Sequence, residues 1–206
     1  MKGVFISFEG ADGSGKSTQI KLLSDYCKEK GLDVLQTREP GGTQISEKIR
    51  NIILDPDNTE MGAATEALLY ASSRAQLVEE VIKPALSEGK IVLCDRFMDS
   101  SIAYQGYARK LGDGVRLINE FAIQSLQPNL TFFLDLDPKE GRERNVVVGK
   151  KDRMEKEELT FHQDVYKGYK KLAEIYKDRY VNIDASKSVE EVFQEIKKVF
   201  DNYISK

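Results

Sequence analysis

A glycine-rich segment near the start of the chain limits the possible folds more than any other feature. Residues 10–17 read Gly-Ala-Asp-Gly-Ser-Gly-Lys-Ser and match the pattern G-x-x-x-x-G-K-[ST]. An apolar run at 4–8 precedes the segment and a helical pattern at 16–30 follows it, which is the context that this pattern requires. Glycines let the backbone approach an anion, so that successive N–H groups and the positive helix end face it. The segment therefore predicts a phosphate-binding turn.

Two side chains at the end of this turn predict how a nucleoside triphosphate and its metal ion are held. Lys16 is expected to reach the β- and γ-phosphates of ATP, and the Ser17 hydroxyl is expected to ligate Mg²⁺. The remaining residues of the expected ATP-binding turn are Gly10, Ala11, Asp12, Gly13, Ser14, Gly15 and Thr18. Asp12 has an alternative role as a cap of the following helix, because aspartate favours such local turns.

Short apolar runs alternate with longer helical patterns along the rest of the chain. Strands that are mostly apolar on both faces are predicted at 4–8, 34–37, 91–94, 130–134 and 180–183. Such strands belong in a parallel sheet that helices cover on both faces. Helices are predicted at 16–30, 44–54, 65–86, 115–125, 160–178 and 189–200, and loops at 55–60 and 148–158. We therefore predict one α/β domain over residues 1–206, with a five-stranded parallel sheet between two layers of helices.

Charge and hydropathy argue against two classes of partner. A net charge of -3 provides no broad basic face for nucleic acid, although a local pocket of cations remains possible. No apolar run approaches the roughly 20 residues that span a bilayer. The first residues lead directly into a strand rather than a signal peptide, so a cytoplasmic protein without membrane contact is expected.

The cysteine and histidine content argues against several kinds of site. Cys27 and Cys94 lie far apart and form no CxxC motif, so two buried thiols are expected rather than a disulfide or a zinc site. The single histidine, His162, argues against a histidine-dependent metal site or a Ser-His-Asp triad. His162 is expected to be a solvated helix residue.

An acid and a cation follow the predicted strand at 91–94. Asp95 has the position of a second Mg²⁺ ligand, and one carboxylate acting partly through water is enough for this ion. Arg96 stands where an ATPase would carry an acidic residue to activate water. A guanidinium at this point suits a second phosphorylated substrate, because it binds phosphate with two parallel hydrogen bonds. The alternative is an ordinary ion pair at a strand end.

Four segments, taken in order, resemble the motifs of bacterial thymidylate kinases. Segments 8–18, 37–43, 95–97 and 100–106 read Phe-Glu-Gly-Ala-Asp-Gly-Ser-Gly-Lys-Ser-Thr, Thr-Arg-Glu-Pro-Gly-Gly-Thr, Asp-Arg-Phe and Ser-Ser-Ile-Ala-Tyr-Gln-Gly. The glycine-rich turn is typical of a whole superfamily, whereas the second and fourth segments are much narrower signatures. The resemblance implies the three-layer P-loop kinase fold. It also implies a homodimeric kinase that transfers the γ-phosphoryl group of ATP to dTMP with Mg²⁺, for the supply of dTTP to DNA synthesis.

The segment at 38–43 follows a strand and opens a helix, which places it at the edge of the sheet where ligands of α/β folds bind. The resemblance supports Arg38 and Arg96 as the pair that holds the acceptor phosphate. It also implies a cis peptide bond before Pro40. The alternative for Arg38 is an ion pair with Glu39 or another surface acid.

Tyr70 and Arg74 are four residues apart in a helical pattern and therefore project from one face. An aromatic plane beside a guanidinium can stack a nucleobase and bond its carbonyl edge. The resemblance assigns these roles to the two residues, although relatives commonly carry phenylalanine at the first position. The alternative for Tyr70 is an ordinary core aromatic.

The resemblance implies three further contacts to the acceptor nucleotide. Ser101 and Gln105 are expected near the base, and Tyr104 beside the sugar 2′ position, where its ring would crowd a ribose hydroxyl. Asp12 is the acid expected to meet the 3′-hydroxyl.

Residues 141–153 resemble a mobile lid that closes over ATP. Arg144 matches the arginine that packs on adenine in relatives, but the additional arginines that many relatives carry are replaced by Asn-Val-Val-Val at 145–148. Arg153 is the best candidate for the catalytic cation of the lid, and Lys150 and Lys151 are the next candidates. The alternative is that Arg153 only pairs with Asp152 or Glu155 to fold the lid.

Two other functions use the same turn. Another nucleoside monophosphate or deoxynucleoside kinase would share the chemistry, whereas a GTP-binding switch would need an Asn-Lys-x-Asp motif that this sequence lacks. The β3-Lys and His-Arg-Asp patterns of protein kinases are also missing.

Overall fold

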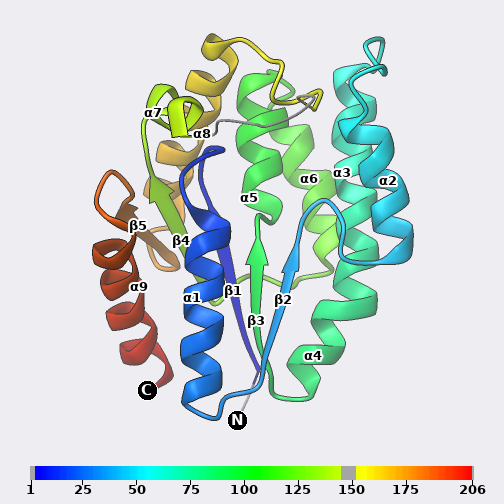
Figure 1. The fold of residues 1–206 in the computed structure, drawn as a ribbon. Coiled ribbons are helices and arrows are strands. Elements are labelled where there is room, and N and C mark those ends of the chain that lie inside the picture. The colour runs from blue at the N-terminus through cyan, green and yellow to red at the C-terminus, as the bar shows by residue number, and fades with distance from the viewer. Residues whose placement is uncertain (1–2, 145–151, 206) are drawn as a thin grey trace.

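Five parallel strands form the centre of the fold (Figure 1). The computed structural model describes residues 3–144 and 152–205. The strands lie in the order β2-β3-β1-β4-β5. All five predicted strands and the parallel α/β architecture are confirmed. The bounds are β1 (Val4–Glu9), β2 (Val34–Arg38), β3 (Ile91–Asp95), β4 (Leu130–Asp135) and β5 (Tyr180–Asp184).

Each strand runs one residue beyond its predicted end. The additional residues are all charged: Glu9, Arg38, Asp95, Asp135 and Asp184. The apolar pattern stops before these side chains, whereas the backbone ladder continues because its hydrogen bonds do not depend on side-chain polarity. Charged groups are therefore fixed at the carboxyl ends of parallel strands, where α/β folds bind their ligands.

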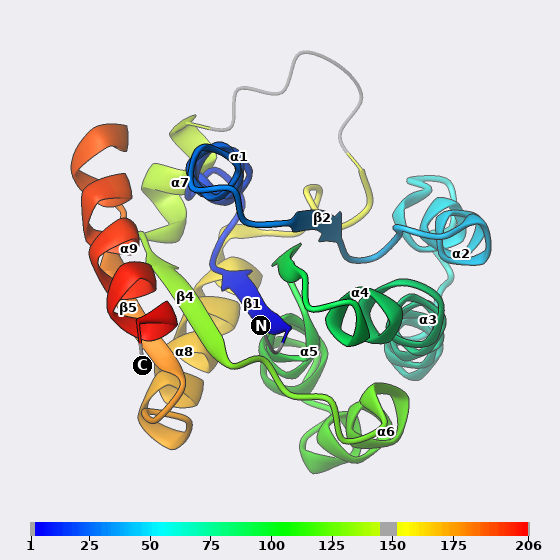
Figure 2. The same ribbon diagram turned by 90° about the horizontal axis from the view of Figure 1, so that it is seen from below.

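Helices cover both faces of the sheet. Helices α1 (Lys16–Glu29) and α9 (Val189–Ile204) pack together on one face, and Figure 2 shows α1 and α5 on opposite sides of β1 and β3. The other helices are α2 (Gln44–Leu54), α3 (Ala63–Leu77), α4 (Lys83–Ser87), α5 (Met98–Ser101), α6 (Asp113–Ile123), α7 (Pro138–Arg144), α8 (Leu159–Ile175) and the π-helical segments η1 (Val78–Ile82) and η2 (Ile102–Ala108).

Successive residues of the central strands point into two separate cores, as the period of two in a strand requires. Phe5 and Val92 lie in the core that α3, α5 and α8 cover. Ile6 and Leu93 lie in the core that α1 and α9 cover. All four side chains are almost completely buried. A sheet buried on both faces explains why its strands are continuously apolar.

The predicted helices are present, but one of them is interrupted. The pattern at 65–86 divides into α3, η1 and α4. Pro84 cannot donate a backbone hydrogen bond and its ring displaces the carbonyl four residues earlier, so the helix widens into π geometry in the preceding turn. Helices α5 and α7 and segment η2 were not predicted. Their sequences are short or rich in Ser, Gly and Tyr and lack helical periodicity.

The prediction of a solvated His162 is wrong. This side chain is only 8% exposed, because it belongs to the stripe of α8 that also buries Val165, Tyr169 and Leu172. Burial lowers the pKa of His162 and outweighs the opposing effect of Asp12. The expectation for the cysteines is confirmed, since Cys27 and Cys94 are both buried and free.

The loop predicted at 55–60 is confirmed, because the structure has no helix or strand at these described residues. Of the loop predicted at 148–158, the described part begins at residue 152 and consists of turns. The expected lid at 141–153 lies partly outside the described residues. Over residues 3–144 and 152–205, no helix is long and apolar enough to span a membrane.

Candidate active site

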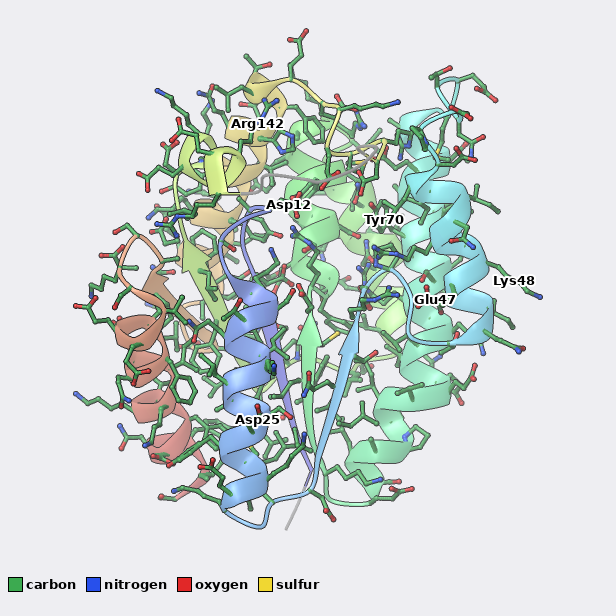
Figure 3. The ribbon with its side chains drawn as sticks, viewed as in Figure 1. Asp12, Asp25, Glu47, Lys48, Tyr70 and Arg142 are labelled. Carbon is green, nitrogen blue, oxygen red and sulfur yellow. The ribbon has the colours of Figure 1, made fainter. Side chains whose placement is uncertain are left out.

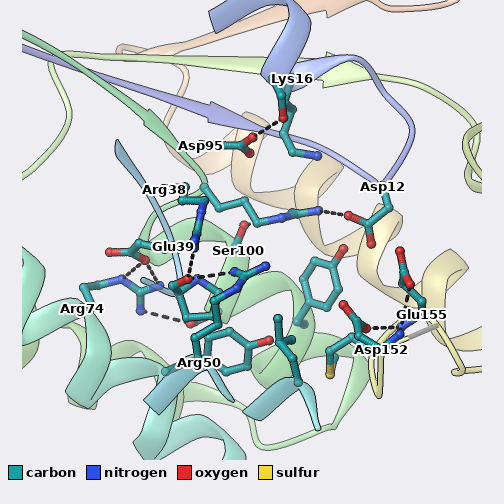
Figure 4. Close-up of a pocket in the computed structure, with 18 of the residues that line it drawn as sticks. Asp12, Lys16, Arg38, Glu39, Arg50, Arg74, Asp95, Ser100, Asp152 and Glu155 are labelled. Carbon is teal, nitrogen blue, oxygen red and sulfur yellow. Dashed lines mark hydrogen bonds and ion pairs between the residues drawn. The ribbon is translucent and has the colours of Figure 1, made fainter. Parts of the chain in front are cut away.

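A cavity of about 550 Å³ opens at the carboxyl edge of the sheet (Figure 4). Its walls come from the glycine-rich turn, the ends of β2 and β3, helices α2 and α3, segment α5–η2 and the chain at 152–155. Figure 3 shows Asp12 on the turn and Tyr70 on the α3 side, both above the strand ends. The expected site residues that line the cavity are Asp12, Gly13, Gly15, Lys16, Ser17, Thr18, Arg38, Tyr70, Arg74, Asp95, Arg96, Ser101, Tyr104 and Gln105.

The turn before α1 is arranged to receive an anion. Within the described residues no side chain caps the N-terminus of α1, which leaves its first N–H groups to a ligand. Asp12 therefore does not act as the helix cap. Gly13 has a φ of 78°, and a Cβ atom there would come within 2.0 Å of the Gly141 carbonyl oxygen. Only glycine fits at this position.

Lys16 is 7% exposed and bends back over the turn. Its ammonium donates to the carbonyl oxygens of Gly10 and Ala11, at 3.1 and 2.9 Å. Burial lowers the pKa of Lys16 to about 8, and the neighbouring Arg96 adds to this effect. An incoming phosphate would exchange these weak carbonyl contacts for charge-assisted ones.

Ser17 and Asp95 are in direct contact at the opposite side of the turn. The serine hydroxyl donates to Asp95 Oδ2 at 2.7 Å. A hydroxyl and one carboxylate fit Mg²⁺, which keeps several waters and binds substrate phosphates rather than an all-protein cage. The described residues contain no cluster of three or more His, Cys, Asp or Glu suited to a metal ion.

Arg96 has a strained backbone that its surroundings hold in place. Its φ is 69°, in the left-handed region, which costs about 1–3 kcal/mol for a residue other than glycine. The guanidinium donates to Asp12 at 2.7 Å, to Tyr169 Oη at 3.0 Å and to Ser100 Oγ at 3.2 Å. It also lies 5.2 Å from the centre of the Tyr104 ring. A cation fixed in this way is pre-organised for a phosphate.

Asp12 and Glu9 have opposite pKa shifts beside this arginine. Burial would raise the pKa of Asp12, but Arg96 and Lys16 hold it at about 2. Glu9 is fully buried, and burial together with Asp99 raises its pKa to about 7. Its carboxyl group accepts hydrogen bonds from Ser100 Oγ at 2.6 Å and from Tyr169 Oη at 3.0 Å.

The sequence analysis did not identify Glu9 as a site residue. Its signal was an acid at the end of a wholly apolar strand, directly before the glycine-rich turn.

Besides Arg74, three arginines line the cavity: Arg38, Arg50 and Arg96. Arg38 and Arg50 both donate to the carbonyl oxygen of Pro40, at 2.9 and 2.8 Å. Arg38 also pairs with Glu47 at 3.0 Å, so its ion pair is with another surface acid and not with Glu39. The Glu39–Pro40 peptide bond is cis, as the resemblance implied.

Arg50 was missed by the sequence analysis. It lies on α2, whose N-terminus is fixed by Thr43, because the Thr43 hydroxyl accepts a hydrogen bond from Ser46 N at 3.0 Å. The same segment that carries Arg38 therefore also sets the direction of the helix that carries Arg50. The sequence signal was an arginine two turns into this helix.

Arg74 is completely committed to protein contacts in this structure. It is 1% exposed, forms a buried ion pair with Glu39, and donates to Ser101 Oγ, to Asn119 Oδ1 and to the carbonyl oxygen of Phe97. With two bonds to Glu39, all five of its N–H groups have partners. Arg74 thus forms the floor of the cavity, beside Tyr70.

The segment α5–η2 supplies the third wall. Ser101 and Gln105 are each only 1% exposed. Tyr104 is 8% exposed, and its hydroxyl has no hydrogen-bond partner in the part of the chain that the structure describes. Gln105 donates its amide N–H to Glu66 at 2.9 Å. Ser101 and Gln105 are therefore held by charged side chains of α3.

The two expected lid arginines lie outside the lining of the cavity, as do Gly10, Ala11 and Ser14. Arg144 donates to the carbonyl oxygens of Ala185 and Ser186, at 2.8 and 3.3 Å. The segments at 145–148 and 150–151, with the two candidate lysines, are outside the described residues.

Arg153 is 11% exposed and pairs with Glu66 at 2.6 Å, and its Nε donates to the Ile53 carbonyl oxygen. Within the described residues, its ion pair is thus not with Asp152 or Glu155. These two acids instead bond each other's backbone N–H groups and line the cavity.

Comparisons with known proteins agree with this geometry. A family model described as thymidylate kinase matches residues 8–196. The thymidylate kinase of Geobacillus sp. (strain WCH70) is 56% identical over 196 residues, covering 94% of this chain and 93% of the relative. That of Lactobacillus helveticus (strain DPC 4571) is 54% identical over 200 residues, covering 95% and 94%. The crystal structure of thymidylate kinase from Ehrlichia chaffeensis superposes with a TM-score of 0.79 at 33% identity, covering 98% of this chain and 99% of that one. The chain belongs to the thymidylate kinase family.

Proposed function

We propose that this chain transfers the γ-phosphoryl group of ATP to dTMP and releases dTDP, the precursor of dTTP for DNA synthesis. The observation that carries the proposal is that one cavity joins a triphosphate-binding turn to a second wall of cations and an aromatic ring. A protein that only hydrolysed ATP would have no use for the second wall. Membership of the family supports dTMP as the acceptor.

On the donor side, the turn at 10–18 and Lys16 bind the phosphates of ATP. Ser17 and Asp95 would hold Mg²⁺, which would neutralise negative charge on the phosphates. Arg144 packs on the adenine, and its bonds to Ala185 and Ser186 support this position beside the end of β5.

On the acceptor side, Arg38 and Arg96 bind the phosphate of dTMP, and Arg50 adds a third positive charge. Tyr70 stacks on the thymine, and Tyr104 closes the space at the sugar 2′ position. Asp12 meets the 3′-hydroxyl while it keeps Arg96 in place. Because Arg96 contacts residues of both halves, it can bridge the acceptor phosphate and the transferring group.

The transfer is direct and in line, without a covalent intermediate on the protein. Phosphoryl transfer depends on positioning and on stabilisation of charge, which Lys16 and Arg96 provide here. The lid at about 141–153 excludes water, and Arg153 is our candidate for its transition-state cation. In the described arrangement Arg153 is bound to Glu66, so it must leave this partner before it can reach the phosphates.

We also propose that the enzyme is a homodimer that works in the cytoplasm, where ATP and dTMP are available. Helices α2, α3 and α6 pack side by side. They carry large apolar side chains that are exposed. The most exposed are Phe121 at 87% and Leu117 at 57% on α6 and Leu68 at 54% on α3. A second copy of the chain would cover them.

Turnover with ATP and a panel of monophosphates tests the proposed acceptor. We expect dTMP to give the highest kcat/KM and dTDP as the product. Preference for another monophosphate would assign the chain to a different nucleotide kinase. Slow hydrolysis that no acceptor stimulates would contradict kinase activity altogether.

A further inference from the structure

Two charged side chains of helix α3, eight residues apart, bond two neutral side chains of segment α5–η2, four residues apart. Helix α3 carries Glu66 and Arg74 on either side of Tyr70. Segment α5–η2 carries Ser101 and Gln105. Arg74 donates to Ser101 Oγ at 3.0 Å, and Gln105 Nε2 donates to Glu66 Oε1 at 2.9 Å. Each neutral side chain is therefore bound to one charged residue of α3.

The charged partners decide which way the neutral groups can bond. A guanidinium only donates, so Ser101 accepts from Arg74 and keeps its own hydroxyl proton for another acceptor. An ionised carboxylate only accepts, so the Gln105 amide must turn its nitrogen to Glu66 and leave its oxygen for another donor. Among the described residues, none donates to Gln105 Oε1 or accepts from the Ser101 hydroxyl.

Glu66 is well fixed in its ionised form. It is completely buried and bonds Arg109 at 3.0 Å and Arg153 at 2.6 Å. Burial alone would raise the pKa of Glu66, but its bonds to Arg109 and Gln105 bring it below the usual value. Arg109 is held in turn by Glu157. The carboxylate therefore remains an acceptor at neutral pH and cannot easily move away from Gln105.

We propose that Glu66 is a positioning residue that sets the selectivity of the enzyme for the base. By holding the amide nitrogen of Gln105, it presents an acceptor to the cavity beside the Ser101 donor. An adjacent acceptor and donor match the N–H and C=O edge of thymine. They oppose the corresponding edge of cytosine, which has an unprotonated ring nitrogen and an amino group. This inference rests on the proposed function, because it assumes that the cavity binds a pyrimidine monophosphate.

Glu66→Gln tests the inference, because an amide in place of the carboxylate can either donate or accept and so lets Gln105 turn over. We expect the ratio of kcat/KM for dTMP over dCMP to fall by about 10-fold or more, as when a base-edge hydrogen bond loses its discrimination. The ratio for dTMP over dUMP should stay within about 2-fold of the parent, because uracil has the same N–H and C=O edge. General damage to the site would change both ratios.

Arg109→Met is the matched control. It removes one partner of Glu66 but leaves the bond to Gln105, so it should lower the thermal midpoint and keep the dTMP over dCMP ratio of the parent. If Glu66→Gln does not fold, Glu66→Gln/Arg109→Gln, which keeps the net charge of the cluster, replaces it. A folded variant without the carboxylate that keeps the parent's dTMP over dCMP ratio overturns the inference.

A crystal structure of the parent with dTMP gives a second readout that does not depend on any variant. Gln105 Nε2 should remain on Glu66, with Oε1 on the thymine ring N–H. The opposite orientation of the amide overturns the inference. If the parent itself does not phosphorylate dTMP, the proposed function fails instead.

Discussion

Replacement of Arg74 by alanine is expected to destabilise the fold as well as the acceptor site. The guanidinium is 1% exposed, and its ion-pair partner Glu39 is 5% exposed. Its removal leaves this carboxylate without a cation, and Ser101 and Asn119 without a donor. Loss of one partner of a buried ion pair costs about 3–5 kcal/mol. In a protein of this size, the thermal midpoint should fall by roughly 6–20 °C.

The deficit of Arg74→Ala should depend on pH in a defined direction. Burial raises the pKa of Glu39 from 4.5 to about 7 in the parent, even though Arg74 opposes this shift. A raised pKa means that the folded state holds its proton longer than the unfolded state, so stability falls as pH rises through this range. Without Arg74 the pKa of Glu39 rises further, and the loss continues above pH 7. The difference between parent and variant should therefore widen between about pH 7 and pH 8.

Urea unfolding followed by far-ultraviolet circular dichroism measures this difference, since the chain has no tryptophan for fluorescence. Arg116→Ala, which removes an exposed arginine from an ion pair on α6, serves as the control and should leave stability unchanged. A loss below about 1 kcal/mol for Arg74→Ala would show that the ion pair with Glu39 does not support the fold.

Substitutions at four other positions separate the proposed roles. Arg96→Ala should raise the KM for dTMP and lower kcat while the KM for ATP stays near the parent value. An equal rise in the KM for ATP would contradict the proposed position of this guanidinium at the dTMP phosphate. Tyr70→Phe should change dTMP affinity little and Tyr70→Ala should weaken it, since base stacking is worth roughly 1–3 kcal/mol. If calorimetry shows that both variants bind dTMP like the parent, Tyr70 is a core residue. Arg153→Ala should lower kcat on the order of 10³-fold with an unchanged KM for dTMP, and Arg153→Lys should recover only part of the lost kcat. A variant with lower stability and the parent's kcat would show that Arg153 serves only its contact to Glu66. Asp12→Asn should lower the free energy of unfolding by about 1 kcal/mol at pH 6, a figure reduced because Asp12 is 39% exposed. Because the pKa of Asp12 in the folded state is depressed to about 2, the difference in stability between parent and variant should shrink as pH falls below 3.8. A difference that stays constant with pH would contradict the ion pair with Arg96.

The sequence predicted the sheet well because hydrophobic burial on both faces leaves a continuous apolar pattern. It predicted the α3–η1–α4 region less well, since a helical period cannot show that Pro84 turns part of the helix into π geometry. Segment η2 had no apolar period to detect. His162 was misjudged because residue type was given more weight than its place on the buried stripe of α8.

The candidate site, too, could be predicted only where its residues belong to a local sequence pattern. Motifs identified the groups that can face a ligand directly, such as Lys16, Arg96 and Tyr70. They did not identify Glu66 and Glu9, whose buried carboxyl groups bond Gln105 and Ser100. Such residues depend on which elements pack together, and a buried acid has no local pattern that distinguishes it from a solvated one. The i, i+4 spacing of Glu66 before Tyr70 was the one available hint.

The most direct test of the central claim follows the γ-phosphoryl group itself. ATP that is isotopically chiral at the γ-phosphorus is incubated with the enzyme, Mg²⁺ and dTMP, and the configuration of the β-phosphorus of the product dTDP is determined. Direct in-line transfer within one cavity predicts that the label appears in dTDP with inverted configuration. Retention of configuration, or label that appears only in inorganic phosphate, would contradict the account.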